Sequence, residues 1–504
     1  MKIAFFILLF LLSNSYGELL QSPLKVPIII NKKATPVLHL SNVGKTVVLD
    51  LKGSDNISNI LKIQIVEGHK NSFKKDYEIL SEAEVLSEQV VLKLSKNLTT
   101  ATVLIQVKKT VDLLDKLSIK VAGTEAAYKH RFGISLVDEQ KVKGARIPGI
   151  VTTPKGTLLA VYDARYDNAR DLQGHMDIGL VRSTDGGQTW SPMQKIIDMK
   201  TWGGLPEKYN GVSDACILVD KLTGKVFVAG LWMHGVKDKN GKWIGAKGWN
   251  HQWRKGGSMS GLNPKETSQF MMVESSDDGQ SWTEPLNLTK ALKKPEWMLF
   301  APAPGRGITM KNGTLVMPTQ GRLANGMPFS NFIYSQDRGK TWKVSEPAHT
   351  NTTECQIVEL KNGSLMLNMR DNRKAAAKNI AEAGRSVYVT KDMGQSWVMH
   401  PTSRKALPEP VCCAGLWAHG KDNLLVFSNP PNLRTAGGRT KMTLKFSQDD
   451  GFTWPQRHFL MLDEKHSAYS CLTSVDENTI GILYEGSQAK MTFMKIDLKD
   501  ANLD

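Results

Sequence analysis

The feature that most constrains this 504-residue chain is an eight-residue motif, Ser/Thr-x-Asp-x-Gly-x-x-Trp, which occurs five times after residue 180. The copies occupy residues 183–190, 275–282, 335–342, 390–397 and 447–454. The motif has the chemistry of a turn: its short oxygen side chains can bond nearby backbone amides, its glycine takes a positive φ, and its tryptophan anchors the turn on apolar surface. Five copies predict a repeat architecture in which the motif is structural and performs no catalysis by itself.

A second repeat consists of hairpin turns, each followed by an apolar run typical of a strand. The turn dipeptides are Lys155-Gly156, Thr223-Gly224, Asn312-Gly313, Asn362-Gly363, Asp422-Asn423 and Glu477-Asn478. Six successive hairpins, five of them followed by a copy of the motif, indicate six antiparallel sheets. They predict an all-β fold, a six-bladed β-propeller, which hides sheet edges by radial repetition. The Gly-, Lys- and Trp-rich stretch Lys237–Glu266 is expected to be an inserted loop.

The chain before these repeats predicts two further parts. Residues 1–17 hold a lysine, an apolar run and a small-residue region, the pattern of a cleaved signal peptide, so we expect an exported protein, periplasmic or secreted. Residues 18–125 contain short alternating runs rich in β-branched residues, which predict a small β-sandwich, an accessory domain with carbohydrate binding as its suggested role. Residues 126–504 would then form the propeller. We expect no membrane span, since the apolar run near the start has only ten residues and no later stretch approaches the roughly 20 needed.

Charge and cysteine content narrow the function classes. The chain has 65 Lys and Arg against 49 Asp and Glu, a net charge of +16, which favours an anionic partner but is equally consistent with a solvated lysine-rich surface. The basic residues are scattered without a nucleic-acid-binding signature, so we expect no nucleic acid partner. The five cysteines have neither CxxC spacing nor an accompanying histidine cluster, and no nucleotide motif is present. We therefore expect buried thiols, with one disulfide bridge as the open alternative, and no metal and no cofactor.

Strand arithmetic places a set of polar residues at one end of the ring. Arms of similar length on either side of a hairpin end at the same sheet edge. Counting back nine or ten residues from the hairpins, and forward seven to nine, finds Arg146, Asp214, Glu354, Tyr469, Arg165, Gln320, Arg370 and Glu485. Asp171 and Arg439 lie in links at the same end. Strands often end in polar residues, but like charges crowded around a propeller axis cost free energy unless a ligand or counter-charges offset them, so we predict a binding pocket.

These residues carry a resemblance to a known family. The Arg146-Ile147-Pro148 motif, the five turn motifs (Asp-boxes) and the order Arg–Asp–Glu–Arg–Arg–Tyr resemble the bacterial exo-α-sialidases of glycoside hydrolase family 33, specifically those of Bacteroidota with a β-rich N-terminal domain. The resemblance covers about residues 140–500. It implies hydrolysis of terminal α-linked sialic acids from glycoproteins, glycolipids and oligosaccharides, with sialylated glycans as partners and no cofactor. We expect a monomer.

The resemblance also implies residue roles. The arginine triad that binds the substrate carboxylate falls on Arg146, Arg370 and Arg439, and the acid/base aspartate on Asp171. The nucleophilic tyrosine falls on Tyr469 and its base on Glu354. Asp214 and Arg165 would contact the sugar's polar substituents, and Glu485 would orient the first triad arginine. Two alternatives stay open: a trans-sialidase shares every one of these residues, and a non-catalytic lectin would need only the arginines.

The chemistry suits these residue types. Permanently charged planar guanidiniums hold a carboxylate in one orientation. A carboxylate nucleophile would meet the substrate's own negative charge, whereas a phenol is neutral until a base activates it, and sialidases are known for a tyrosine nucleophile. The reaction would retain the anomeric configuration. We expect the triad arginines to lower the pKa of the neighbouring phenol and acids, so Asp171 would need burial or a closed pocket to stay protonated.

Overall fold

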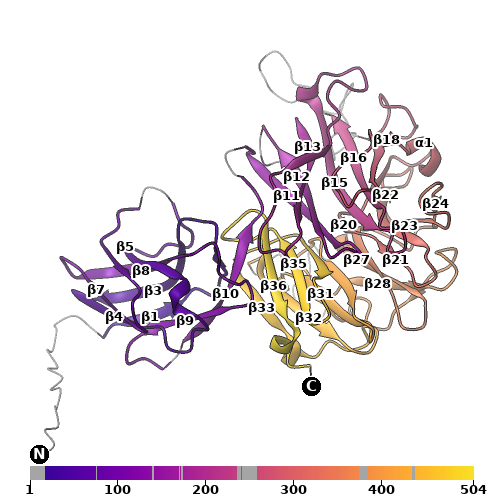
Figure 1. Cartoon of the computed structure of the whole chain (residues 1–504). Helices are drawn as coiled ribbons and strands as arrows, with labels where there is room; N and C mark the ends of the chain where they lie inside the picture. The colour runs from indigo at the N-terminus through magenta and orange to yellow at the C-terminus, as the bar shows by residue number, and fades with distance from the viewer. Residues whose placement is uncertain are drawn as a thin grey trace, which may run out of the picture. The chain divides into compact units, whose positions relative to one another are not determined.

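The structure is a computed structural model that describes residues 18–503, apart from residues 75–76, 126, 139–140, 168, 170, 172–173, 235–239, 241–257, 374–382 and 434–436 (Figure 1). The expected signal peptide lies outside the described residues, as does most of the expected insertion Lys237–Glu266. Within the described part, the chain forms two compact units. The first holds residues 18–28, Lys32–Val111 and Asp115–His130, and the second holds Ile29–Asn31, Asp112–Leu114 and the chain from Arg131 onward. The predicted boundary after residue 125 stays a prediction.

The first unit is a β-sandwich, as expected. One antiparallel sheet has the order β1 (Leu20–Pro23), β3 (Thr35–Val43), β8 (Leu98–Val107), β5 (Ile60–Glu67), β6 (Ser81–Glu84). The other strands are β9 (Lys116–Val121), β4 (Thr46–Asp50) and β7 (Gln89–Lys93), with the 3₁₀ turn η1 at Ile57–Asn59. Buried and exposed positions alternate along β7 and much of β4, which is the period-2 pattern of strands with one buried face. Strand β10 (Tyr128–Ser135), which also pairs with β2 (Ile28–Ile29), leads out of this unit.

The second unit is a β-propeller built from successive antiparallel meanders. The first three are β11 (Gly144–Thr152), β12 (Leu158–Arg165), β13 (Met176–Ser183), β14 (Gln194–Ile197); β15 (Asn210–Val219), β16 (Val226–His234), β17 (Gln269–Ser275), β18 (Leu286–Asn287); and β19 (Leu299–Pro302), β22 (Leu315–Arg322), β23 (Pro328–Ser335), β24 (Lys343–Val344). The next are β26 (Thr352–Glu359), β27 (Leu365–Asp371), β28 (Ser386–Thr390), β29 (Val398–Met399); β30 (Gly415–His419), β31 (Leu424–Asn429), β32 (Thr440–Ser447), β33 (Leu460–His466); and β34 (Ser470–Ser474), β35 (Thr479–Tyr484), β36 (Thr492–Asp497). Short elements lie between them: α1 (Thr289–Leu292), β20 (Gly305–Arg306), β21 (Ile308–Thr309), β25 (His349–Thr350), η2 (Glu207–Tyr209), η5 (Gln456–His458) and η6 (Leu498–Ala501).

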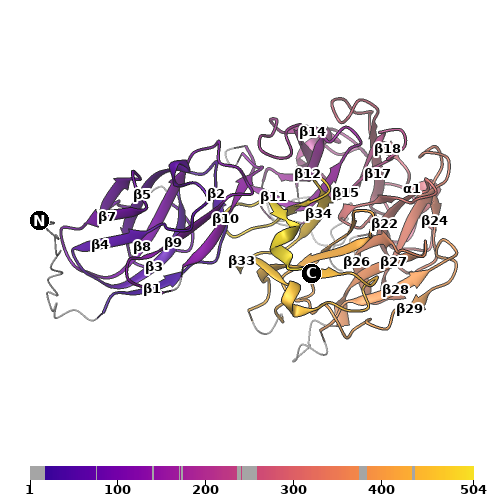
Figure 2. The same cartoon turned by 60° about the horizontal axis from the view of Figure 1, so that its bottom comes forward.

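The ring closes through the two ends of this unit. Strand β10 pairs with β36, with Ile134 opposite Phe493, and so completes the last meander. In Figure 2 the yellow strand β34 lies beside the purple strand β11, and these two strands make direct contact. We propose that each meander is one blade, which gives the predicted count of six. No helix among the described residues is long and apolar enough to cross a membrane.

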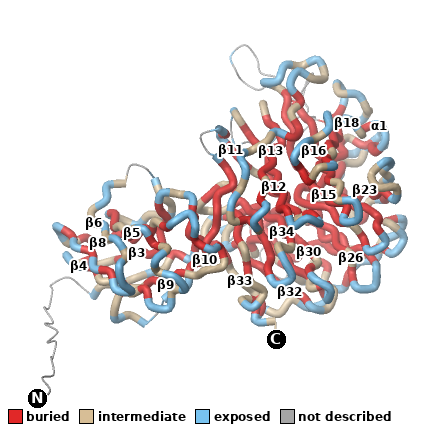
Figure 3. Tube along the Cα trace, in the orientation of Figure 1, coloured by how far each residue is buried: buried red, intermediate tan, exposed pale blue. Residues whose placement is uncertain are grey.

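The Asp-boxes follow the third strand of their meanders and adopt the expected turn. In the first box the Ser183 hydroxyl accepts a hydrogen bond from the amide of Gly187 (2.8 Å), and Asp185 Oδ1 accepts one from the amide of Thr189 (3.0 Å). Gly187 has φ +91°, and the Trp190 indole N–H donates to the Gly187 carbonyl (2.9 Å). Each motif therefore fastens the end of a third strand. Buried aliphatic and aromatic residues fill the interior of the blades, and buried stretches of the trace are red in Figure 3.

Candidate active site

The predicted site residues surround one cavity of about 280 Å³ in the propeller unit. Seven of the nine line it: Arg146, Asp171, Asp214, Glu354, Arg370, Arg439 and Tyr469. The other two, Arg165 and Glu485, lie behind lining residues and bond to them. The strand arithmetic therefore brought the correct ends of the strands together, although the blades that supply them are hundreds of residues apart in the sequence.

Register shifts, typical of β-bulges, set the direction of three of these side chains at the ends of their strands. The register of β11 shifts between Arg146 and Gly149, that of β15 between Ser213 and Cys216, and that of β26 between Thr352 and Cys355. Arg146, Asp214 and Glu354 lie at these shifts, which bend a strand and redirect its side chains. Asp214 itself has φ +58°, a conformation that non-glycine residues seldom adopt. Hairpin spacing carries no sign of these bulges, so sequence analysis did not predict them.

The three triad arginines converge on the phenol of Tyr469. The Cζ atoms of Arg146 and Arg439 lie 5.2 and 5.4 Å from the centre of the tyrosine ring, and Arg370 Nη1 donates to the phenolic oxygen (2.9 Å). Arg439 Nη2 also donates to the carbonyl of Val411 (3.2 Å). Three guanidiniums around one point create a strongly positive cavity that suits a carboxylate ligand.

A buried Tyr–Glu–Arg group forms the floor of the cavity. The Tyr469 hydroxyl donates a hydrogen bond to Glu354 Oε1, and Arg370 Nη1 donates to Glu354 Oε2 (2.5 Å). Burial, together with the negative charge of Glu354, holds the pKa of Tyr469 well above its ordinary value despite the nearby arginines. Arg370 and Arg439 lower the pKa of this phenol, as expected, but the loss of hydration outweighs their charges and the net shift is upward. The phenol is protonated, and Glu354 is in place to accept its proton.

Glu485 holds the first triad arginine from behind. Its two carboxylate oxygens accept hydrogen bonds from Nε (3.1 Å) and Nη2 (3.2 Å) of Arg146, and Oε1 also accepts from the amide of Ile147 (3.0 Å). This two-pronged arrangement fixes the plane of the guanidinium and leaves Nη1 directed elsewhere. Its geometry agrees with the orienting role that the sequence resemblance implies.

Asp171 lies above this guanidinium with a side chain that is 59% exposed. Its Oδ1 accepts from Arg146 Nη1 (2.9 Å) and from Arg165 Nη1 (2.8 Å). Burial alone would raise the pKa of Asp171, but the charges of these two arginines prevail and lower it, as expected. The geometry thus favours the ionised form of Asp171. Arg165 is fully buried, is paired with Asp163 (2.8 Å) and does not line the cavity, so its predicted contact with the sugar stays a prediction.

Asp214 has the opposite electrostatic character. It is 8% exposed, accepts a hydrogen bond from the Gln320 side-chain amide (3.2 Å), and lies near the carboxyl groups of Asp163 and Glu354. Burial and these neighbouring negative charges raise its pKa well above the ordinary value. Both effects favour the neutral acid, the form that could donate a hydrogen bond into the cavity.

Part of the cavity wall was missed by sequence analysis. Arg322, Gly326, Pro328, Thr353 and Asn372 also line it. Arg322 ends β22 nine residues after the glycine of the third hairpin, so the forward count that found other site residues could have found it. Asn372 directly follows β27, two residues after Arg370, and nothing in its spacing marks it.

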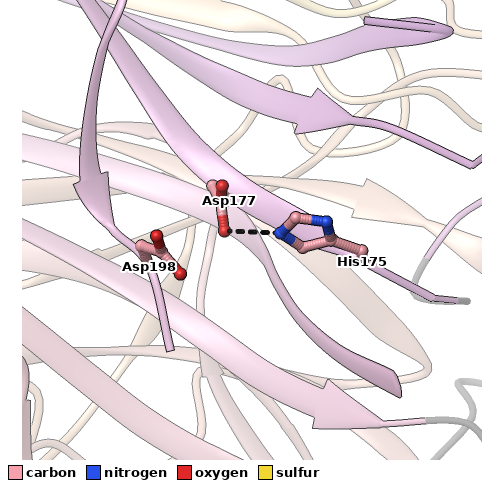
Figure 4. Close-up of side chains that lie close together, drawn as sticks. All are labelled: His175, Asp177 and Asp198. Atoms are coloured by element: carbon pink, nitrogen blue, oxygen red, sulfur yellow. Dashed lines mark ion pairs between the residues drawn. The ribbon is translucent and has the colours of Figure 1, made fainter. Parts of the chain in front are cut away.

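One grouping among the described residues has metal-like ligands: His175, Asp177 and Asp198 (Figure 4). The ammonium group of Lys195 lies 2.8 Å from Asp177 Oδ2 and 3.7 Å from Asp198 Oδ2, and His175 Nε2 lies 3.2 Å from Glu207 Oε1. The pKa of His175 is raised, chiefly by its interaction with Asp177. Lys195 and His175 thus already supply positive charge to these carboxylates, and the grouping is an ion-pair cluster at the base of the loop that carries Asp171.

A β-propeller with a positive cavity, an ionised carboxylate at its mouth and a tyrosine–glutamate pair on its floor has the parts of an enzyme that cleaves glycosides of an acidic sugar. Comparison with known proteins agrees. A family model described as a BNR repeat-like domain matches residues 156–482. The chain is 38% identical to a sialidase of Bacteroides fragilis over 94% of both chains, and 30% identical to a sialidase of Paraclostridium sordellii over 68% of this chain and 81% of that one. A solved structure, the Hadza microbial sialidase Hz136, superposes with a TM-score of 0.85 at 34% identity over 95% of this chain and 99% of that one. The chain belongs to the bacterial sialidase family.

Proposed function

We propose that the protein is an exo-α-sialidase that removes terminal α-linked sialic acids from glycans, with Tyr469 as its nucleophile and with retained configuration. The observation that carries the mechanism is the hydrogen bond from the Tyr469 hydroxyl to Glu354 at the point where three arginines converge. A lectin needs guanidiniums to bind the sugar's carboxylate, but it has no use for a buried phenol paired with a base.

Binding would begin at the arginines. The substrate carboxylate, attached to the anomeric carbon, pairs with Arg146, Arg370 and Arg439 and so places that carbon above the Tyr469 oxygen. The neutral acid Asp214 donates a hydrogen bond to a polar substituent of the sugar. Because a carboxylate arriving at Arg146 competes with Asp171 for the same guanidinium, Asp171 loses part of the interaction that keeps it ionised and becomes able to hold a proton.

The chemical step follows from the protons already in place. Glu354 takes the phenolic proton as the Tyr469 oxygen attacks the anomeric carbon, and protonated Asp171 gives its proton to the departing glycosidic oxygen. The product is a tyrosyl–sugar intermediate and a free alcohol. Asp171, now ionised, then removes a proton from water, which attacks the same carbon, and Glu354 returns its proton to the phenol. Two inversions give overall retention.

A chromogenic α-sialoside tests this proposal. The wild type should release the dye, and Tyr469→Phe, which keeps the ring but has no nucleophile, should lose several orders of magnitude in kcat while still binding free sialic acid. Proton NMR of the first product should show the α anomer before mutarotation. Turnover by Tyr469→Phe at the wild-type rate would refute the nucleophile, and a first product with the β anomer would refute retention. Adding a sugar acceptor such as lactose decides between hydrolysis and trans-sialylation.

We also propose that residues 1–17 are removed on export to the periplasm or the medium, that residues 18–125 are an accessory domain, and that the protein is a monomer. Sequencing of the mature N-terminus tests the first point. Light scattering of the purified protein tests the last, and a glycan array with the isolated N-terminal part, if it folds, tests for carbohydrate binding.

A further inference from the structure

A second, deeper ion pair lies behind the cavity, between Arg385 and Glu409. Their closest atoms are 2.5 Å apart, and both side chains are fully buried. Replacing a buried ion pair with apolar groups is often neutral or stabilising, so stability alone is a weak reason for a chain to keep one. The side-chain contacts of this pair show what else it does: each of its other side-chain hydrogen bonds goes to a segment that carries, or touches, a triad arginine.

The first of these segments is the end of β27. Glu409 Oε1 accepts a hydrogen bond from the amide of Asp371 (2.8 Å). Arg385 donates from Nε to the Asn368 side-chain oxygen (2.7 Å) and from Nη2 to the Asn368 carbonyl (3.3 Å). Asn368 and Asp371 lie on either side of Arg370, so the pair holds the backbone from which this triad arginine projects.

The second segment is the irregular stretch before β30, which contains Cys412. Arg385 Nη1 donates to the Cys412 carbonyl (2.9 Å), and the Cys412 amide donates to Glu409 Oε2 (3.3 Å). The pair thus forms hydrogen bonds with both backbone polar groups of Cys412. The residue before it, Val411, has φ +57°, which is strained for a β-branched side chain. Its carbonyl accepts the hydrogen bond from Arg439 (3.2 Å).

Backbone strain of this kind costs on the order of 1–3 kcal/mol and persists only where the surroundings hold it in place. Here the surroundings are the bonds from Glu409 and Arg385 to the next residue, Cys412. Without them Val411 would be free to relax, and its carbonyl would turn away from Arg439. One buried pair is therefore connected to two triad arginines that come from different meanders.

We propose that Arg385 and Glu409 are positioning residues that set the separation and orientation of Arg370 and Arg439 for the substrate carboxylate. This inference rests on the proposed function, in which those arginines bind that carboxylate. It assigns no contact with the substrate to the pair itself. It makes the affinity for a carboxylate ligand depend on two side chains that no ligand can reach.

The test compares Glu409→Gln and Arg385→Lys with the wild type in the full chain. Glu409→Gln removes the charge and one acceptor, whereas Arg385→Lys keeps the ion pair but loses the planar fork that reaches Asn368 and Cys412 together. Asp500→Asn is the matched control, because it breaks another ion pair of the same unit (Arg131–Asp500, 3.2 Å) at residues that do not line the cavity. For each protein we would measure Tm, the Kd of free sialic acid, and KM and kcat for the chromogenic sialoside.

Because a misplacement of about 1 Å can cost on the order of 100-fold, both variants of the pair should raise Kd and KM about 10- to 100-fold, with a smaller change in kcat. Asp500→Asn should lower Tm and leave Kd unchanged. If Glu409→Gln does not fold, Arg385→Lys decides. Adding Val411→Gly to a folded variant of the pair should recover part of the affinity, because glycine takes a positive φ without support. A Kd within twofold of the wild type in the folded variants would overturn the inference. A wild type that binds no sialic acid would instead overturn the proposed function.

Discussion

Asp171 offers the sharpest test of how the empty cavity is prepared for its ligand. In the unliganded protein this carboxylate bonds to Arg146 (2.9 Å) and Arg165 (2.8 Å), and its pKa is lowered by their charges against the effect of burial. A ligand carboxylate needs the same Arg146 nitrogen. Asp171→Asn removes the competing charge and keeps the size of the side chain. We expect this variant, although crippled in hydrolysis, to bind free sialic acid more tightly than the wild type.

The expected size of the change in Kd follows from the exposure of the Asp171 side chain. The Asp171 side chain is 59% exposed, so its pair with Arg146 should be valued as a hydrated ion pair, about 0.2–1 kcal/mol. Repulsion between the ligand carboxylate and Asp171 in a similarly hydrated setting adds an amount of the same order. Removing both the competing ion pair and the repulsion should improve the binding of sialic acid by about 1 kcal/mol, which is roughly a fivefold lower Kd.

Calorimetric titration with sialic acid between pH 5 and 8 measures this directly. Ligand binding draws Arg146 away from Asp171 and adds a negative charge beside it, so the pKa of Asp171 rises on binding. The complex then takes up protons, and linkage requires the wild-type affinity to improve as pH falls toward that raised pKa. Asp171→Asn should lack this slope. The control Asp138→Asn makes the same charge change in an exposed ion pair with Lys141 that does not line the cavity.

Two results would refute the reasoning. Binding to Asp171→Asn that is equal to or weaker than wild-type binding would show that Asp171 does not compete for Arg146. An identical pH slope in both proteins would show that the proton is taken up elsewhere.

Three further predictions concern other charged groups. Glu485→Gln removes the negative charge that bonds to Nε and Nη2 of Arg146. Because charge-assisted hydrogen bonds contribute about 1.5–3 kcal/mol, KM in steady-state assays should rise by about 10- to 100-fold. An unchanged KM would contradict the orienting role of Glu485. Asp214→Asn should keep activity within about threefold, because burial favours the neutral form of this acid and Asn is an uncharged donor of its shape; a loss of 100-fold would mean that the ionised form is needed. Asp177, and then Glu207, raise the pKa of His175, so the protonated imidazole stabilises the fold fully below about pH 6.5 and this stabilisation is lost as pH rises through the raised pKa. The Tm advantage of the wild type over His175→Asn should therefore shrink between pH 6 and 8. A Tm difference that stays constant over this range would exclude the ion-pair contribution.

The sequence was sufficient to predict the fold class and seven of the residues that line the cavity, because both follow largely from counting. Turn motifs and hairpin dipeptides mark the strand ends, and period-2 strands of similar length carry those ends to a common edge. That count found Tyr469, Glu354 and Arg370, which the structure joins by hydrogen bonds. The count could not predict how deeply each of these side chains is buried. Arg165 passes the same test as Arg370, yet it is fully buried beneath Asp171.

The protonation of the site was less predictable than its membership. Sequence alone places guanidiniums near a phenol, which favours a lowered pKa, but the sign depends on how much water the fold removes. At Tyr469 burial wins and the pKa rises, whereas at the more exposed Asp171 the arginines win and the pKa falls. The proposed nucleophile is thus protonated and the proposed acid ionised, although arginines lie beside both.

Backbone strain ties these observations together. Among the described residues, the β-branched side chains with positive φ are Ile147 (+67°) and Val411 (+57°), and each lies beside a triad arginine. In both places a buried glutamate secures the strained peptide: Glu485 accepts from the Ile147 amide, and Glu409 accepts from the amide after Val411. Strain that costs on the order of 1–3 kcal/mol at each residue is offset by hydrogen bonds to carboxylates that do not line the cavity. Binding a carboxylate with converging arginines thus requires buried counter-charges that hold the chain where it would not otherwise rest, so the affinity of this cavity is set as much behind its wall as on its surface.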